Sequence, residues 1–446
     1  MRAICIWVIL VASVCARQVR FTVLHTTDLH GHVENLARCA TLIAQTRATE
    51  KDVFLVDCGD LIQGTAVGWL TGGEVMVRLL NALQYDVWVI GNHEFDWGLA
   101  KLTNCIVRAA MPVLAADVRG LPRTQPYVLK EVGGVKVAII GLSTPGIPNW
   151  SRPRLIPGLQ FDDSLETLRR VVPEVRAKGA QVFVLAAHQG YKERGDDHAN
   201  RIRAISSRFP EFDVILGGHT HRPFPEMRLG QSVYTQAECY GRYLGRVDVV
   251  FDTEKGKVTS VSSRLFSTAE GVQPDEKLLA LVRDEMDRAE RYLATPLGEA
   301  VGAFSVSGGG RRETPVQNLL CRAIATALRR RGVEVDAVVH GLLNERESLA
   351  KGPITMADVW RIVPYENTVG VMDLRAEKLR EILDENAGAY WGYGFRGIWG
   401  LRWRFDPRAA DGMRTLDLRR ADGRKIGDGE TLAVAFNSYE LASGGL

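Results

Sequence analysis

Cysteine is scarce in this sequence and shows none of the spacings that build disulfide-rich or zinc-stabilised domains. Seven cysteines occur in 446 residues, and Cys5 and Cys15 lie within the apolar N-terminal stretch. The other five are widely scattered without a C-x-x-C pair, which excludes a disulfide framework or a zinc ribbon. We expect most of them to be small buried residues, and one or two disulfides stay open.

The chain also lacks an excess of charge of either sign. Its 56 Lys and Arg against 53 Asp and Glu give a formal net charge of +3, and Arg329-Arg330-Arg331 is typical of its short basic runs. This balance disfavours a nucleic-acid polymer or a membrane surface as partner. Beyond the N-terminus, no apolar run is long enough to span a membrane. We therefore expect a small-molecule partner, and the oligomeric state stays open.

The first sixteen residues are typical of a secretory signal peptide. Arg2 precedes an apolar run that ends at Cys15, and the small residues Val14 and Ala16 stand just before Arg17. The run is short for a membrane span, although an uncleaved N-terminal anchor stays open. The sequence therefore predicts a signal over residues 1–16 and a secreted or periplasmic protein.

The rest of the chain is predicted to form a layered α/β domain followed by a second domain. Short apolar runs alternate with amphipathic stretches, and after residue 232 strand follows strand, which indicates a mixed sheet. The predicted elements are strands at 21–25, 53–56, 87–90, 135–140, 182–185 and 214–216, and a helix at 164–178. A polar loop and one helix over 274–295 indicate a linker at 268–295 between domains at 17–267 and 296–446.

Polar clusters of one chemical kind follow five of the predicted strands. They are Asp28-Leu29-His30, Gly59-Asp60, Gly91-Asn92-His93-Glu94, His188, and His219-Thr220-His221. Because sites in layered α/β proteins lie at the carboxyl ends of strands, we expect these clusters to converge. Carboxylate, imidazole and amide groups together suit divalent manganese, iron, zinc or cobalt. Each cluster alone could be a turn, a cap or an exposed strand, but the ordered set indicates a two-metal site.

This ordered set resembles the calcineurin-like metallophosphoesterase superfamily. The run from Asn92 to Asp96 narrows the resemblance to the family of 5′-nucleotidases and 2′,3′-cyclic-nucleotide phosphodiesterases. The resemblance implies an α-β-β-α catalytic domain with mixed sheets and a C-terminal α+β substrate-binding domain. It also implies a hydrolase that attacks phosphate esters with a metal-activated hydroxide.

The resemblance assigns roles to individual residues. It implies that Asp28, His30, Asp60 and His221 hold one metal ion, and that Asp60, Asn92, His188 and His219 hold a second. It further implies that His93, oriented by Asp96, faces the phosphate as the catalytic pair. His221 departs from many nucleotidases, which carry an amide there, and follows the wider superfamily.

In the second domain the resemblance implies substrate contacts by Arg312 and Arg346 and base stacking by Phe395. These residues could equally be solvated arginines and a core aromatic. Gly341 and Arg322 depart from the family, and the sequence stops at Leu446, before the loop that usually carries a second stacking aromatic. An incomplete C-terminus and a differently built pocket both stay open.

Three functions remain in view. The favoured one is a nucleotide phosphohydrolase, and the segments 143–150 and 223–225 lean towards its cyclic-nucleotide branch. The same metal centre could act on a sugar phosphate or a sulfur-linked ester. The least favoured is a non-catalytic binding protein, because such a scaffold would usually have lost a ligand or His93.

Overall fold

The computed structural model describes residues 18–442, except residues 270, 365–366 and 393. The predicted signal peptide lies outside these described residues. The chain divides into two compact units. The first comprises Met1–Gln63, Gly72–Ile147 and Leu155–Val282, and the second comprises Gly64–Thr71, Pro148–Arg154 and Arg283–Leu446.

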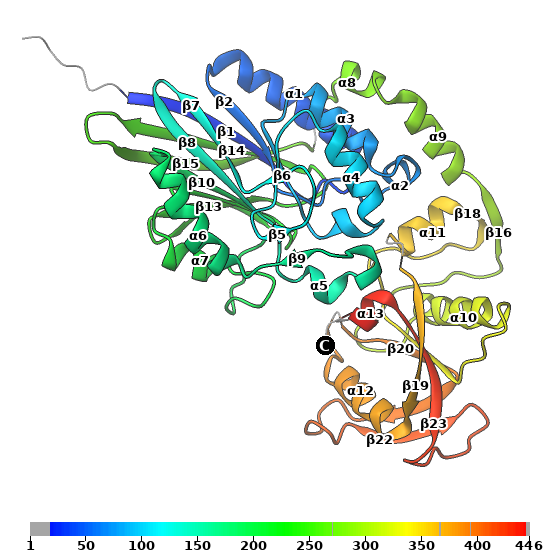
Figure 1. The fold of residues 1–446 in the computed structure, drawn as a ribbon. Coiled ribbons are helices and arrows are strands. Elements are labelled where there is room, and N and C mark those ends of the chain that lie inside the picture. Colours follow the sequence, from blue (N-terminus) through cyan, green and yellow to red (C-terminus); the bar gives the residue numbers. More distant parts are fainter. Residues whose placement is uncertain (1–17, 270, 365–366, 393, 443–446) are drawn as a thin grey trace, which may run out of the picture. The chain divides into compact units, whose positions relative to one another are not determined.

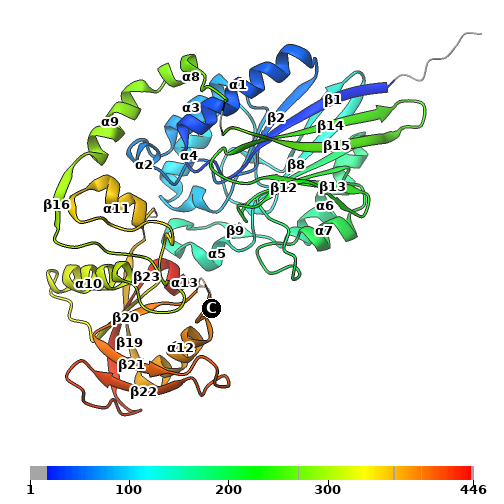
Figure 2. The same ribbon diagram turned by 180° about the vertical axis from the view of Figure 1, so that it is seen from behind.

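Two sheets form the centre of the first unit, with β14 and β15 beside β1 in the first of them (Figures 1 and 2). This seven-stranded sheet has the order β15 (Lys257–Ser267), β14 (Tyr243–Asp252), β1 (Gln18–Thr26), β2 (Val53–Asp57), β3 (Val87–Val89), β4 (Val113–Leu114) and β6 (Thr124–Gln125). The six-stranded sheet has the order β12 (Pro223–Leu229), β13 (Ser232–Ala237), β11 (Val214–Gly217), β10 (Val182–Ala187), β8 (Val135–Leu142) and β7 (Tyr127–Val132). Because β1 pairs parallel to β2 and antiparallel to β14, the predicted mixed sheet is confirmed.

The alternation of side chains along β8 shows how the layers are built. Val137 and Ile139 join a core made by residues of both sheets, whereas Ala138 and Ile140 join a second core with the helices α6 (Ser164–Ala177) and α7 (Ile202–Arg208). Successive strand residues point to opposite faces, so one strand serves both cores. The helices α1 (Val33–Thr49), α3 (Glu74–Ala82) and α4 (Leu99–Arg108) lie on the other side of the sheets (Figure 1). The predicted α-β-β-α layering is therefore confirmed.

The predicted single helix over 274–295 is wrong. The segment forms two helices, α8 (Glu276–Ala280) and α9 (Arg283–Leu293), and the Asp275 carboxylate caps the first. Leu278, Leu279 and Val282 are buried with the first unit, which ends at Val282, whereas α9 belongs to the second. The two halves pack in different units, so the helix is interrupted between them.

The second unit is built around a four-stranded sheet of order β19 (Val369–Arg375), β23 (Thr431–Asn437), β17 (Ala337–His340) and β20 (Gly397–Trp399). Val339 of β17 packs in a core with Leu379 and Leu383 of α12 (Ala376–Gly388). Val338 packs on the other face with Cys321 of α10 (Pro315–Arg329). The remaining elements are α2 (Ala66–Thr71), α11 (Met356–Ile362), α13 (Ser438–Ala442), and the strand pairs β16 (Pro296–Ala300) with β18 (Gly352–Thr355) and β21 (Leu401–Phe405) with β22 (Thr415–Arg420). This unit is the expected α+β domain.

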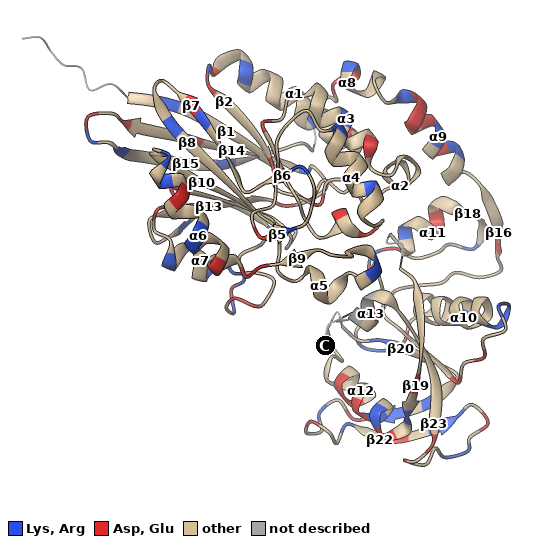
Figure 3. Cartoon of the chain, in the orientation of Figure 1, with Lys and Arg blue, Asp and Glu red and all other residues tan. Residues whose placement is uncertain are grey.

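Charge and cysteine follow the sequence expectations. Figure 3 shows basic and acidic residues interspersed along the helices of each unit. The five cysteines of the described chain are buried and unpaired, as small core residues. None of the described helices combines the length and apolar character that a membrane crossing requires.

Candidate metal centre

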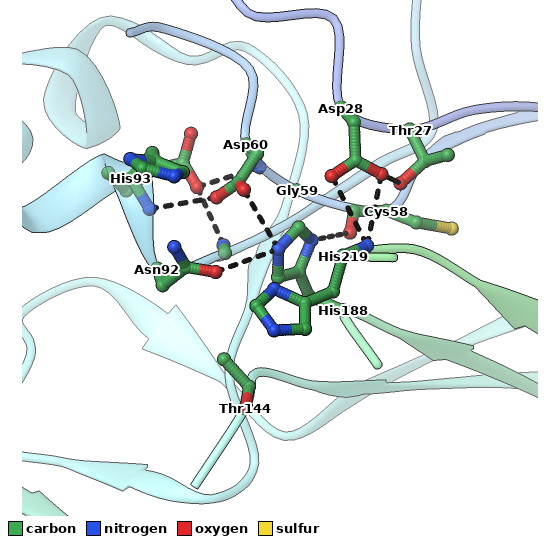
Figure 4. Close-up of polar contacts among 12 residues, drawn as sticks. Thr27, Asp28, Cys58, Gly59, Asp60, Asn92, His93, Thr144, His188 and His219 are labelled. Carbon is green, nitrogen blue, oxygen red and sulfur yellow. Dashed lines mark hydrogen bonds and ion pairs between the residues drawn. The ribbon is translucent and has the colours of Figure 1, made fainter. Parts of the chain in front are cut away.

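Five strand ends deliver polar side chains to one place in the first unit. Asp28 follows β1, Asp60 follows β2, Asn92 follows β3, His188 follows β10 and His219 follows β11. The strands β1, β2 and β3 run parallel, as do β10 and β11, so within each sheet these carboxyl ends share an edge. Figure 4 shows side chains from both sheets converging on Asp60.

Asp60 stands at the centre of two overlapping sets of metal-ligand atoms. One set comprises Asp28, His30, Asp60 and His221, the other comprises Asp60, His188 and His219, and the donor atoms of each set lie within 4.8 Å of one another. Asp60 Oδ2 lies 3.0 Å from His188 Nε2 and 3.8 Å from His30 Nε2. Asn92 Oδ1 lies 3.1 Å from His188 Nε2, which adds an amide oxygen to the second set. The structure therefore brings together all seven residues predicted as ligands.

The donor chemistry of this cluster fits two divalent cations. Carboxylate oxygens, imidazole nitrogens and one amide oxygen are the mixture that suits manganese, zinc, cobalt or iron. Two histidines are fixed through their second nitrogen, since His30 Nδ1 bonds the Gln63 carbonyl at 2.9 Å and His188 Nδ1 bonds that of Cys58 at 2.8 Å. Each of these bonds aims Nε2 towards Asp60, as backbone partners of metal-binding histidines do.

The backbone is strained at most of these residues. Asp28, His30, Asp60, His219 and His221 all have positive φ, between 48° and 69°. Non-glycine residues enter this left-handed region at an energetic cost, so its repetition at one cluster indicates a functional constraint.

Close packing of the turns explains two glycines of the sequence clusters. A side chain on Gly59, which has a φ of +97°, would meet Gly91 N at 2.7 Å and His188 Nδ1 at 2.8 Å. A side chain on Gly91 would meet Asp60 Oδ1 at 2.3 Å. The two turns thus approach so closely that neither has room for a Cβ atom.

Electrostatics at the cluster favour charged carboxylates. Burial disfavours the charged form of Asp60, but His188 and His93 hold the pKa of its carboxyl well below the usual range. Burial lowers the pKa of His30 to about 3 and that of His219 to about 4, which keeps both rings neutral. Burial also opposes the charge on His221, yet Asp28 raises its pKa to about 12. Neutral imidazoles and ionised carboxylates are the forms that bind metals.

His93 is placed beside the ligand cluster with its predicted partner. Its Nδ1 lies 2.7 Å from Asp96 Oδ2, and its backbone N–H donates to Asp60 Oδ1 at 2.8 Å. Its side chain is 27% exposed, in contrast to the buried Asp28 and Asp60. Burial works against the charged imidazolium, but Asp96 and Asp60 raise the pKa of His93 to about 10. A protonated, partly exposed ring at this position can donate to an anion.

Glu94 organises the site, a role that the sequence interpretation missed. This buried carboxylate accepts hydrogen bonds from the backbone N–H groups of Asp60, Leu61 and Gly91, at 2.9, 2.7 and 2.6 Å. It therefore ties the turn that bears Asp60 to the turn that bears Asn92. Its sequence signal was its position directly after His93, but nothing in the sequence names the backbone groups that it binds.

The predicted substrate residues of the second unit are only partly brought together. Arg312 and Phe395 line a cavity of about 630 Å³ with Tyr390, Trp403 and Phe405. Arg346 is exposed and is not among the residues that line this cavity. Phe395 is 3% exposed, and its ring lies 6.2 Å from Trp403 in a stacked arrangement. The cavity wall therefore holds an aromatic cluster in place of a single exposed ring.

Two family models match the chain. Residues 21–223 match the calcineurin-like phosphoesterase model, and residues 295–446 match the 5′-nucleotidase C-terminal domain. The chain is 27% identical to snake venom 5′-nucleotidase of Crotalus adamanteus over 93% of this chain and 78% of the relative. It is 26% identical to 2′,3′-cyclic-nucleotide 2′-phosphodiesterase/3′-nucleotidase of Salmonella typhimurium, over 98% and 83% respectively.

Other matches differ in how much of the relative they cover. The chain is 27% identical to the trifunctional nucleotide phosphoesterase protein YfkN of Bacillus subtilis over 95% of its own length, but it spans 32% of that protein. The crystal structure of the 5′-nucleotidase precursor from Thermus thermophilus superposes with a TM-score of 0.74 at 26% identity, covering 94% of this chain and 89% of that one. Both domains of the fold therefore have solved counterparts.

Proposed function

Because the chain belongs to the calcineurin-like phosphoesterases that carry a 5′-nucleotidase C-terminal domain, we propose that this metal-dependent phosphoric ester hydrolase removes phosphate from nucleotides. It would act as a 5′-nucleotidase, a 2′,3′-cyclic-nucleotide phosphodiesterase or both, outside the cytoplasm. The observation that carries the proposal is the convergence of the two ligand sets on Asp60, with His93 beside them. Relatives named for both nucleotide activities support the choice of substrate.

The chain's own residues divide the work of the reaction. Asp28, His30, Asp60 and His221 would hold one ion, and Asp60, Asn92, His188 and His219 the other. When bound, two such ions supply a water of lowered pKa and polarise the phosphoryl oxygens. His93, held by Asp96, donates a hydrogen bond from a charged ring to the phosphoryl group as negative charge develops there.

The cavity of the second unit is the proposed binding place of the base. Its volume of about 630 Å³ falls in the range of small-molecule sites. Phe395, Trp403 and Phe405 supply aromatic surface, and Arg312 supplies positive charge for an anionic nucleotide. Aromatic stacking accepts every base, so the cavity does not by itself select one.

A substrate panel tests the proposal directly. The purified chain should release phosphate from 5′-mononucleotides or open 2′,3′-cyclic nucleotides faster than it hydrolyses sugar phosphates or sulfur-linked esters. Metal analysis should find about two divalent ions per chain, and activity should vanish on chelation and return with manganese, cobalt or zinc. A preference for a base-free ester would redirect the proposal to that substrate, and full activity without metal would overturn the mechanism.

Truncation of Phe395 tests the role of the cavity. Base–aromatic stacking contributes about 1–3 kcal/mol per base, so Phe395→Ala should raise KM for nucleotides roughly five- to a hundredfold. An aryl phosphate lacks a base and should be hydrolysed almost as before. Steady-state kinetics on both substrates give the contrast.

Because Phe395 is buried, its loss could also destabilise the second unit, so Phe395→Leu serves as a second variant. Leucine keeps most of the apolar volume and removes the aromatic face. Equal losses on both substrates in both variants would mean that Phe395 is structural. Unchanged kinetics on both would mean that the base binds elsewhere.

A further inference from the structure

A second cavity lies in the first unit, apart from the metal-ligand cluster. Its volume is about 560 Å³, within the range of sites for small molecules. Among the side chains that line it are those of Asn35, Arg38, Glu238, Arg242, Tyr243 and Thr268. None of these residues belongs to the metal-ligand sets, so the cavity has no part in the reaction described above.

The charge of this cavity is positive on balance. Arg242 Nη1 pairs with Glu238 Oε1 at 2.6 Å, so these two charges offset each other. Arg38 Nη1 donates to Asn35 Oδ1 at 3.0 Å, and within the described part of the chain Arg38 has no acidic partner. A guanidinium carries five N–H donors in a planar fork that matches carboxylate and phosphate oxygens. Arg38 therefore offers an uncompensated charge and further donors to a ligand.

The walls that hold Arg38 are fixed in advance. Asn35 Nδ2 donates to the Tyr240 carbonyl at 2.7 Å, and Tyr240 N donates to the Asp28 carbonyl at 2.7 Å. On the opposite wall, the buried Thr268 hydroxyl donates to the Gly241 carbonyl at 2.6 Å. A ligand that enters such a preformed site loses less of its binding energy to ordering the protein.

We propose that this cavity binds a small oxyanion, either a phosphate or a carboxylate group, through the guanidinium of Arg38. Arg242 and the Tyr243 hydroxyl lie on the same wall set and can donate to the same ligand. The proposal goes beyond the hydrolase function, since the site is distinct from the metal-ligand cluster and from the aromatic cavity of the second unit.

Calorimetric titration of the manganese-loaded full chain tests the site with two probes, inorganic phosphate and succinate. The parent protein is compared with Arg38→Ala and Arg38→Gln. Arg169→Ala is the matched control, because Arg169 is an exposed arginine of the same unit that also bonds a residue three positions away, Glu166. Phosphate that binds at the metal centre contributes equally to every variant, so only the difference between them reports this cavity.

We expect one binding event to weaken about tenfold or more in both Arg38 variants, as loss of a charge-assisted hydrogen bond implies, and to persist in Arg169→Ala. A loss with phosphate alone assigns a phosphate site, and a loss with succinate alone assigns a carboxylate site. Hydrolysis of an aryl phosphate without probe should stay at the parent rate in each variant, which confirms folding. Titrations of folded Arg38 variants that match the parent for both probes would overturn the proposal.

Discussion

Asp60→Asn should empty both metal sites together and lower the rate of phosphate-ester hydrolysis at least about a thousandfold. The reason is that Asp60 belongs to both ligand sets, with Oδ2 3.0 Å from His188 Nε2 and 3.8 Å from His30 Nε2. The amide keeps the shape of the side chain and can still accept the His93 N–H, so the turn should persist. What changes is the negative charge between the two cations. Metal analysis and kinetics on one sample measure the effect.

Asp213→Asn is the matched control for this experiment. Asp213 precedes β11 at the amino end of that strand, and its carboxylate accepts the Phe183 N–H at 2.9 Å. It loses the same charge in the same unit, but at the opposite end of the strand from His219. Two ions per chain and a nearly unchanged rate are expected. If Asp60→Asn also retained both ions, the bridging role would be wrong.

The gathering of the ligands was predictable because it depends on chain order and strand direction alone. Asp28 and Asp60 each follow an apolar strand, and β1 and β2 are parallel, so their carboxyl ends share an edge. His219 and His221 required one further assumption, that the second sheet directs its strand ends to the same place. The five strand ends carry enough chemistry to make that assumption in advance.

Other features depend on contacts that the sequence does not encode locally. The spacing of Leu278, Val282 and Ala289 suits one continuous helix, and the interruption after Leu281 arises because the two halves pack in different units. Glu94 binds backbone N–H groups of a turn more than thirty residues away in the sequence. Backbone donors are present at nearly every residue, so no side-chain pattern could reveal which ones it meets.

The burial of Phe395 has the same origin. The sequence shows an aromatic stretch from Tyr390 to Trp403, which fits a core or a binding pocket equally well. In the structure Phe395 packs against Tyr390, Trp403 and Phe405 and also lines a cavity. The same ring therefore has both roles open to it, which is why the Phe395 experiment contrasts two substrates.

His93→Ala should separate catalysis from metal binding. In the proposed mechanism His93 stabilises charge on the phosphoryl group and binds no ion, so the variant should retain about two ions per chain. Loss of a positioned acid or charge-stabilising group lowers kcat by roughly two to four powers of ten. KM should change far less, since the group acts mainly as the transition state forms. Metal content, kcat and KM measured on one preparation provide the test.

Asp96→Asn provides the graded comparison that makes the His93 experiment decisive. Asp96 touches the substrate only through His93, whose Nδ1 it contacts at 2.7 Å, and its charge helps to raise the pKa of that ring to about 10. Its amide variant should therefore lower kcat in the same direction as His93→Ala but by less, and the double variant should be no worse than His93→Ala alone. Additive losses would show that Asp96 acts independently of His93. Loss of metal from His93→Ala would instead place the ring among the ligands, and an unchanged kcat would remove it from the mechanism.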